Sequence, residues 1–195
     1  MKKIVKYSLW ACGVIIGLPI VAILIFVGYI LHSDSETDNN ENLRPPLTWN
    51  RQNFVDEFGA PTSNHYEQTS IIGRFSNSAT TDSKLKVIIN IQCDSTISFR
   101  FREYGTSVVK NTKLSGKARD SNGFISEFVL YVDDDGWGDM VPDWPWNKKT
   151  IKMLSSNHKV DIVLNEASDL GIPSKYYFTI PENSGLKEAM DRANK

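Results

Sequence analysis

The first part of the chain is dominated by one unbroken apolar segment. From Ser8 to Leu31, 24 residues pass without a charged side chain. A helix of this length measures about 36 Å at about 1.5 Å per residue, more than the roughly 30 Å of hydrocarbon in a bilayer. The pattern predicts a transmembrane signal anchor within residues 1–32, which contacts the lipid bilayer through residues 8–31.

Two alternatives for this segment are a cleavable signal peptide and a lipoprotein signal. A signal peptide has an apolar region of about 7–15 residues and a small-x-small cleavage site. This run is longer, and its end at Gly28–His32 lacks such a site. The residues before Cys12 resemble a lipobox, but Trp10 is bulky and most of the apolar run follows the cysteine. We therefore favour an uncleaved anchor.

The charges that flank the span predict its orientation. Three lysines precede it and four acidic residues follow it: Lys2, Lys3 and Lys6, then Asp34, Glu36, Asp38 and Glu41. The positive-inside rule places the N-terminus in the cytoplasm. We expect a single-pass protein of the inner or plasma membrane, with its C-terminal domain in the periplasm or outside the cell.

Residues 33–46 are polar and acidic, without any regular spacing of apolar side chains. Such a segment cannot bury enough apolar surface to offset the loss of chain entropy on folding. We expect a disordered tether here, followed by an exported, β-rich domain at residues 47–195.

Further along, apolar and polar residues alternate with a period of two, which is typical of half-buried strands. Val87–Cys93 and Ile97–Phe101 flank a short turn and predict a hairpin, whose outer face is cationic at Arg100 and Arg102. Three more strands are predicted: Phe124–Val132, Val160–Leu164 and Tyr176–Ile180.

Helical spacing is confined to three short segments. They run from Thr48 or Asn50 to Phe58, over Asn147–Leu154, and after a capping Ser184, where Leu186, Ala189 and Met190 share one side. Strands dominate. The predicted fold class is therefore α+β and β-rich, an antiparallel β-sandwich or barrel-like domain with short flanking helices.

The composition of the chain mainly excludes classes of function. From Leu47 onward, 18 basic side chains face 19 acidic ones. No cationic excess exists to displace counterions from a nucleic acid, so we expect no nucleic-acid partner. The sequence also lacks glycine-rich nucleotide loops and zinc-type Cys/His spacing, and no cofactor is predicted from motifs.

The densest acidic cluster lies at Asp133–Asp139. Asp133, Asp135 and Asp139 are spaced as in the latter half of a calcium loop, and they are the candidate metal ligands. Tyr131 and Pro142 stand where an EF-hand has its first acid and its last glutamate. A solvated turn bounded by glycines is the favoured interpretation, and calcium binding is the alternative.

Three tryptophans follow in a loop that also contains two prolines. Trp137, Trp144 and Trp146 are the candidate ligand- or partner-binding residues, because aromatic side chains supply large contact areas. The same residues would also suit a lid over the core. Both interpretations stay open.

No catalytic motif accompanies these features. His65 and His158 are the only histidines after residue 46, and neither lies beside a nucleophile motif. No residue is predicted to be catalytic. Cys93 ends an apolar strand face, and we expect it to be a buried thiol.

The order of several segments resembles a known group of proteins. Ile91-Gln92-Cys93, Phe99-Arg100-Phe101, the strand Phe124–Val132 and the ending Phe178-Thr179-Ile180 follow one another as in the exported domains grouped with VasI/TagO, accessory proteins of type VI secretion, which this chain resembles. More distantly, it resembles invasion-associated locus B proteins. The similarity covers roughly residues 86–193 and implies a non-enzymatic envelope domain. The disulfide it implies for Cys93 has no partner cysteine near the C-terminus.

The leading hypothesis is a membrane-anchored envelope accessory or binding module without catalysis, associated with secretion and with an envelope protein as its partner. An enzyme that acts on envelope polymers through the Asp133–Asp139 loop is one alternative. An immunity or inhibitor protein that faces an incoming toxin is another.

Topology gives the first testable prediction. A reporter that is active only outside the cytoplasm, fused after Lys195, should be active, because the lysines before the span stay inside. N-terminal sequencing of the membrane-bound protein should find Met1–Leu31 retained. Activity of a reporter that works only in the cytoplasm would show the opposite orientation. A shortened N-terminus would show that the segment is a cleaved signal peptide.

Overall fold

A computed structural model describes residues 47–166 and 173–195. Within these ranges, no helix has both the length and the apolar character needed to cross a membrane. The predicted anchor at residues 1–32 and the tether at 33–46 lie outside the described residues. Pro46–Lys195 form one compact unit, which contains the entire described core.

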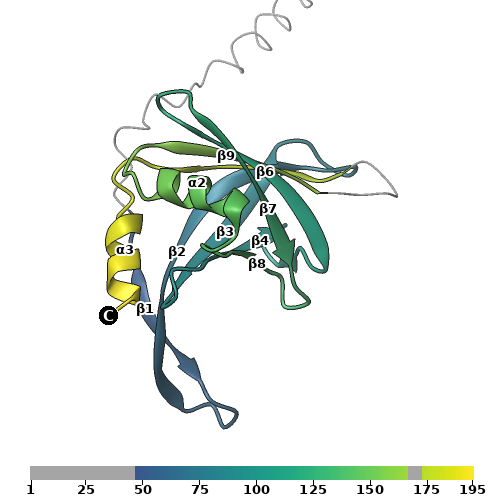
Figure 1. The fold of residues 1–195 in the computed structure, drawn as a ribbon. Coiled ribbons are helices and arrows are strands. Elements are labelled where there is room, and N and C mark those ends of the chain that lie inside the picture. Colours follow the sequence, from purple (N-terminus) through teal and green to yellow (C-terminus); the bar gives the residue numbers. More distant parts are fainter. Residues whose placement is uncertain (1–46, 167–172) are drawn as a thin grey trace, which may run out of the picture. The chain divides into compact units, whose positions relative to one another are not determined.

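The described residues form ten strands and two helices (Figure 1). In chain order they are β1 (Asn50–Val55), β2 (Pro61–Ser76), β3 (Ser83–Gln92), β4 (Ile97–Glu103), β5 (Ser107–Val108), β6 (Thr112–Asp120), β7 (Ile125–Val132), β8 (Trp137–Met140), α2 (Pro145–Leu154), β9 (Val160–Glu166), β10 (Lys175–Ile180) and α3 (Leu186–Ala193).

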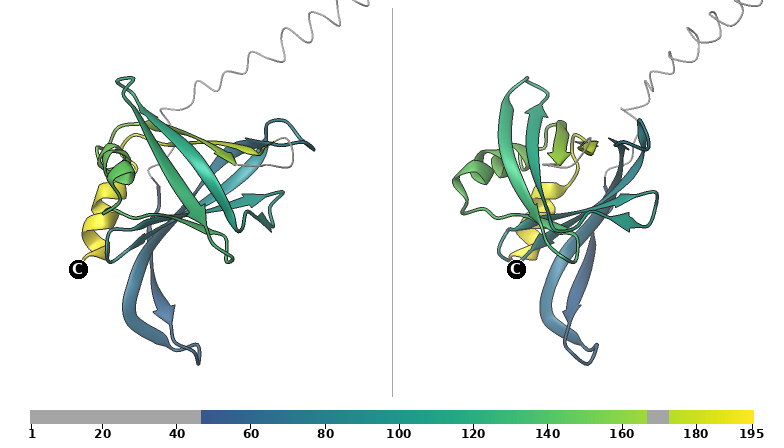
Figure 2. Two further views of the ribbon diagram at one scale, coloured as in Figure 1. Left: turned by 45° about the vertical axis from the view of Figure 1, so that its right-hand side comes forward. Right: turned by 90° about the vertical axis from the view of Figure 1, so that its right-hand side faces the viewer.

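Eight of these strands close into an antiparallel barrel. Their order is β2-β10-β9-β6-β7-β8-β4-β3, and β3 pairs back with β2 to complete the ring. The strand β1 pairs with the first half of β2 outside the ring, and β5 pairs with β4. Figure 2 shows the β1–β2 hairpin projecting away from the barrel.

The barrel interior is filled by one face of each of the eight barrel strands. Along β3, for example, Leu85, Val87, Ile89 and Ile91 are fully buried, and the residues between them are exposed or half-buried. Aromatic rings fill the middle, where Phe101 lies 5.5 Å from Tyr176 and 6.1 Å from Phe178, centroid to centroid. This alternation follows from the pleat of a strand, whose successive side chains point to opposite faces.

Two glycines allow the barrel to close tightly. A Cβ atom at Gly73 of β2 would collide with the backbone of Tyr177 in β10, and one at Gly116 of β6 would collide with the Phe128 ring. Both positions therefore need a residue without a side chain.

The two helices cover parts of this barrel. Helix α2 lies against β7, where the buried hydroxyls of Ser126 and Thr150 are 2.9 Å apart. Helix α3 lies against β2 and β3 and buries Leu186, Ala189 and Ala193.

Several predictions are confirmed. The hairpin forms as β3 and β4, with Ile91 opposite Ile97, and its outer face carries the half-buried Arg100 and Arg102. The β-rich class is also confirmed, and the barrel is the alternative that forms.

Three local predictions are wrong. The segment from Asn50 is the strand β1 rather than a helix, because its backbone pairs with β2 and Phe54 packs on Tyr66 with ring centroids 4.9 Å apart. Cys93 is exposed, because β3 ends at Gln92 and the cysteine falls in the following turn. Gly185, not Ser184, is the residue at the N-cap of α3.

Candidate functional site

The candidate site is an aromatic cluster on the outer wall of the barrel. We define the aromatic cluster as Tyr131 of β7, Trp144 at the N-cap of α2 and Trp146 in the first turn of α2. The Tyr131 and Trp144 rings meet edge to face at 5.9 Å, and the Trp144 and Trp146 rings are also 5.9 Å apart. Lys113 of β6 places its Nζ 5.8 Å from the Tyr131 ring.

Exposure distinguishes this cluster from the core. Tyr131 is 52% exposed and Trp146 is 51% exposed, whereas Trp144 is half-buried between them. The interior of the barrel is filled by other residues, so the cluster is not a lid of fully buried side chains. Pro145 follows Trp144 at the start of α2 and restricts the backbone that carries both indoles.

The third predicted tryptophan lies on the same wall but in a different contact. Trp137 of β8 is paired in register with Arg100 of β4, and the guanidinium carbon of Arg100 lies 5.5 Å from the indole centroid. Asp139, two residues further along β8, lies between Tyr131 and Ser98 on the neighbouring strands. The structure thus brings Trp144 and Trp146 together and sets Trp137 one strand away from Tyr131.

The acidic cluster is a hairpin turn between β7 and β8. The N–H of Trp137 donates to the Asp133 carboxylate at 2.8 Å, and the N–H of Gly136 donates to the Asp133 carbonyl at 3.2 Å. Gly136 has a φ of +86°, as a hairpin loop of this kind requires. The Asp133 side chain therefore stabilises the turn by accepting this hydrogen bond.

Two other turns repeat this arrangement. The N–H of Ala60 donates to the Asp56 carboxylate at 2.8 Å, and the N–H of Phe124 donates to the Asp120 carboxylate at 2.9 Å. Each turn has a glycine three residues after the aspartate, with a φ of +81° in both cases.

Among the described residues, the Asp133–Asp139 loop shows no converging set of metal ligands. The Asp133 carboxylate already accepts a backbone N–H, and in the described ranges no three His, Cys, Asp or Glu side chains gather as metal ligands would. The calcium hypothesis for Asp133, Asp135 and Asp139 finds no support in these residues, because calcium requires six to eight converging oxygens.

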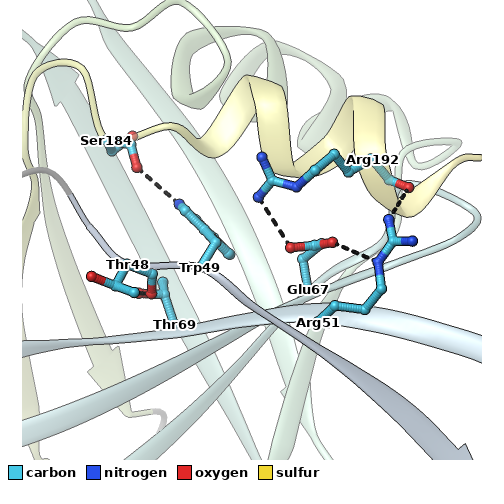
Figure 3. A network of polar contacts seen from close by, with 7 residues as sticks. All are labelled: Thr48, Trp49, Arg51, Glu67, Thr69, Ser184 and Arg192. Carbon is cyan, nitrogen blue, oxygen red and sulfur yellow. Dashed lines mark hydrogen bonds and ion pairs between the residues drawn. The ribbon is translucent and has the colours of Figure 1, made fainter.

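A second polar constellation fastens α3 to the barrel (Figure 3). Glu67 of β2 is only 2% exposed, and its two carboxylate oxygens accept bonds from Arg51 Nε at 3.1 Å and from Arg192 at 3.0 Å. Arg51 also donates to the Arg192 carbonyl at 3.0 Å. We call these three residues the Glu67 latch.

Two neighbouring hydrogen bonds fix the residues just before β1. Trp49 Nε1 donates to the Ser184 carbonyl at 2.8 Å, and the Thr69 hydroxyl donates to the Thr48 carbonyl at 2.9 Å. An open depression of about 530 Å³ lies here, lined partly by Trp49, Glu67 and Glu188. Both oxygens of the buried carboxylate are occupied, so the latch is suited to holding α3 rather than to transferring protons.

Burial alone would raise the pKa of Glu67. The hydrogen bonds and charges of Arg192 and Arg51 outweigh that effect and hold the pKa of this carboxyl below its ordinary value. The carboxylate form is therefore stabilised in the folded protein.

Sequence reasoning missed one further exposed feature. The tip of the β1–β2 hairpin carries three exposed apolar side chains, Phe54, Val55 and Phe58, and Phe58 is 86% exposed. Their spacing also fits one face of a helix, although Asp56 and Gly59 mark a hairpin turn.

Comparison with known proteins adds no relative: neither family models, nor curated proteins, nor solved structures match this chain. The resemblance to VasI/TagO-type and locus B-type domains stays a prediction.

The latch predicts a specific dependence of stability on pH. Glu67→Gln should lower the free energy of unfolding by about 2 kcal/mol at pH 7, because it removes charged hydrogen bonds from a buried site. Since the folded pKa is depressed, this contribution is complete above the unfolded value of about 4.3 and is lost as pH falls through the folded pKa.

Urea unfolding from pH 7 to pH 3 measures this difference. Glu127→Gln is the matched control, because it breaks an exposed pair with Lys117 (2.8 Å) and should leave the midpoint nearly unchanged. A Glu67→Gln effect that is the same at every pH would contradict the prediction.

Proposed function

We propose that this chain is a membrane-anchored binding module of the cell envelope, which holds a protein partner without catalysis. The observation that carries the proposal is the aromatic cluster, in which the Trp144 ring contacts both other rings, on the outside of a barrel whose interior is already filled. Its predicted anchor at residues 8–31 would keep the module at the membrane, facing the periplasm or the exterior.

The physical reason is the cost of exposing such rings. Removing apolar surface from water contributes about 25 cal/mol per Å², and two half-exposed aromatic side chains leave much of this free energy unused. A partner that covers these rings would release this free energy on binding. The rings also lose little conformational freedom on binding, because they pack on one another and Pro145 restricts the chain between the indoles.

The polar groups of the cluster suit a protein partner. The Tyr131 hydroxyl and the two indole N–H groups can each bond a partner while the ring faces are covered. Lys113 beside Tyr131 supplies a positive charge at the rim. Aromatic centres with a charged rim are common in protein interfaces.

The competing enzyme hypothesis is weaker. Its candidate residues are the aspartates of the Asp133–Asp139 loop, but Asp133 serves the hairpin turn, and Asp139 lies in the ladder between Tyr131 and Ser98. An association with secretion is inferred only from the VasI/TagO-type resemblance.

Trp146→Ala should separate binding from folding. Because Trp146 is 51% exposed, its removal should change the free energy of unfolding by no more than about 0.5 kcal/mol, while an interface anchor of this type is worth about 2 kcal/mol, or roughly 30-fold in affinity. The measurement is quantitative cross-linking of the full chain to envelope proteins in cells, with thermal unfolding of the purified unit beside it.

Phe124→Ala is the matched control, since Phe124 is 55% exposed in the β6–β7 turn, outside the cluster. It should leave both partner capture and stability unchanged. Unchanged capture by Trp146→Ala, or unfolding caused by that substitution, would refute the proposal.

A further inference from the structure

Four basic side chains stand together on the outer face of β3 and β4. Lys84 and Lys86 alternate with buried residues along β3, and Arg100 and Arg102 do so along β4. We call these four residues the basic face. In the part of the chain that the structure describes, no carboxylate forms a salt bridge with any of them.

This arrangement is unfavourable within the fold itself. Lys86 is directly opposite Arg102 in the ladder, and like charges in such pairs destabilise a sheet. The Nε atoms of Arg100 and Arg102 are buried and have no hydrogen-bond partner among the described residues. Opposed like charges with no paired carboxylate among the described residues leave the basic face without an anionic counterpart.

The positive charge is concentrated on the basic face, whereas the domain as a whole is nearly neutral. The chain from Leu47 onward has 19 acidic and 18 basic side chains. On the neighbouring strand β2, Arg74 is neutralised by Asp82 at 3.0 Å. A local excess of positive charge on a nearly neutral domain points to an anionic surface as its ligand.

Apolar side chains lie among these cations. Trp137 stacks beside Arg100, and Ile72, which is 53% exposed, is opposite Lys86 on β2. Basic side chains mixed with an indole and an aliphatic side chain are typical of proteins that rest on a lipid headgroup layer. The outside of a barrel is convex, which suits a broad surface better than a small molecule.

We infer that the basic face docks on an anionic lipid bilayer, so that the barrel lies against the membrane. This goes beyond the protein partner proposed for the aromatic cluster, and it rests on the membrane anchoring in that proposal. The tether predicted at residues 33–46 has 14 residues, and a flexible linker of that length spans about 20 Å, so it would keep the domain close to the lipid surface.

The test uses purified Pro46–Lys195, which contains the whole described core, and vesicle flotation. The unit should bind vesicles of phosphatidylcholine with phosphatidylglycerol and dissociate from them as the salt concentration is raised. It should not bind vesicles of phosphatidylcholine alone. Each basic side chain at such a surface contributes about fivefold in affinity, so Lys84→Gln with Lys86→Gln should weaken binding about 25-fold.

Both substituted lysines are exposed, so the variant should fold normally. Lys148→Gln with Lys149→Gln on α2 removes the same charge elsewhere and should change binding by less than about twofold. Equal losses in the two variants, equal binding to neutral vesicles, or no vesicle binding would each overturn the inference. Trp146→Ala should bind vesicles normally, so failure here is distinguishable from failure of the protein-binding proposal.

Discussion

Closure of the sheet is the constraint on which the rest of the structure depends. The strand β2 pairs with β3 on one edge and with β10 on the other, and this joins the first and last parts of the ring. A closed ring of eight strands has an interior just wide enough for its own side chains. Aliphatic residues, phenylalanines and Tyr176 fill that space, so the indoles of Trp137, Trp144 and Trp146 lie outside it.

The outer wall is therefore where we place recognition. The aromatic cluster and the basic face lie on one wall of the barrel. The strand β8, between β7 and β4, connects them. Tyr131 neighbours Asp139, and Trp137 on the same face of β8 neighbours Arg100. We propose that one wall binds a protein at its aromatic end while its basic end lies on lipid. The Glu67 latch acts elsewhere, where it ties α3 and β1 to β2.

Much of this fold is predictable from the sequence where alternation is clean. The β3–β4 hairpin follows directly from Val87–Ile91 and Ile97–Phe101. The strand β2 escapes sequence reasoning because Glu67, Thr69 and Gly73 occupy inward positions that usually hold apolar residues. These residue types are required by tertiary contacts. Glu67 bonds to α3 and Gly73 lies close to β10, and neither contact leaves a local pattern in the sequence.

The candidate site is partly predictable as well. Residue type identifies the tryptophans, but their contact with Tyr131 depends on the pairing of β7 with β8 and the docking of α2. The acidic loop has a better local explanation than calcium, because an aspartate followed three residues later by glycine also occurs at Asp56 and Asp120 in the two other turns. Barrel closure brings together strands distant in sequence, which periodicity alone does not predict.

Hydroxyl-radical footprinting of the full chain, in its native membranes and after detergent extraction, tests the central claim most directly. We expect Tyr131, Trp144 and Trp146 to be protected from oxidation in the membrane and to become reactive after extraction, because partners cover the outer wall. Phe58, at the hairpin tip, should react equally in both states. Protection confined to Phe58, with the aromatic cluster equally reactive in both states, would contradict this claim.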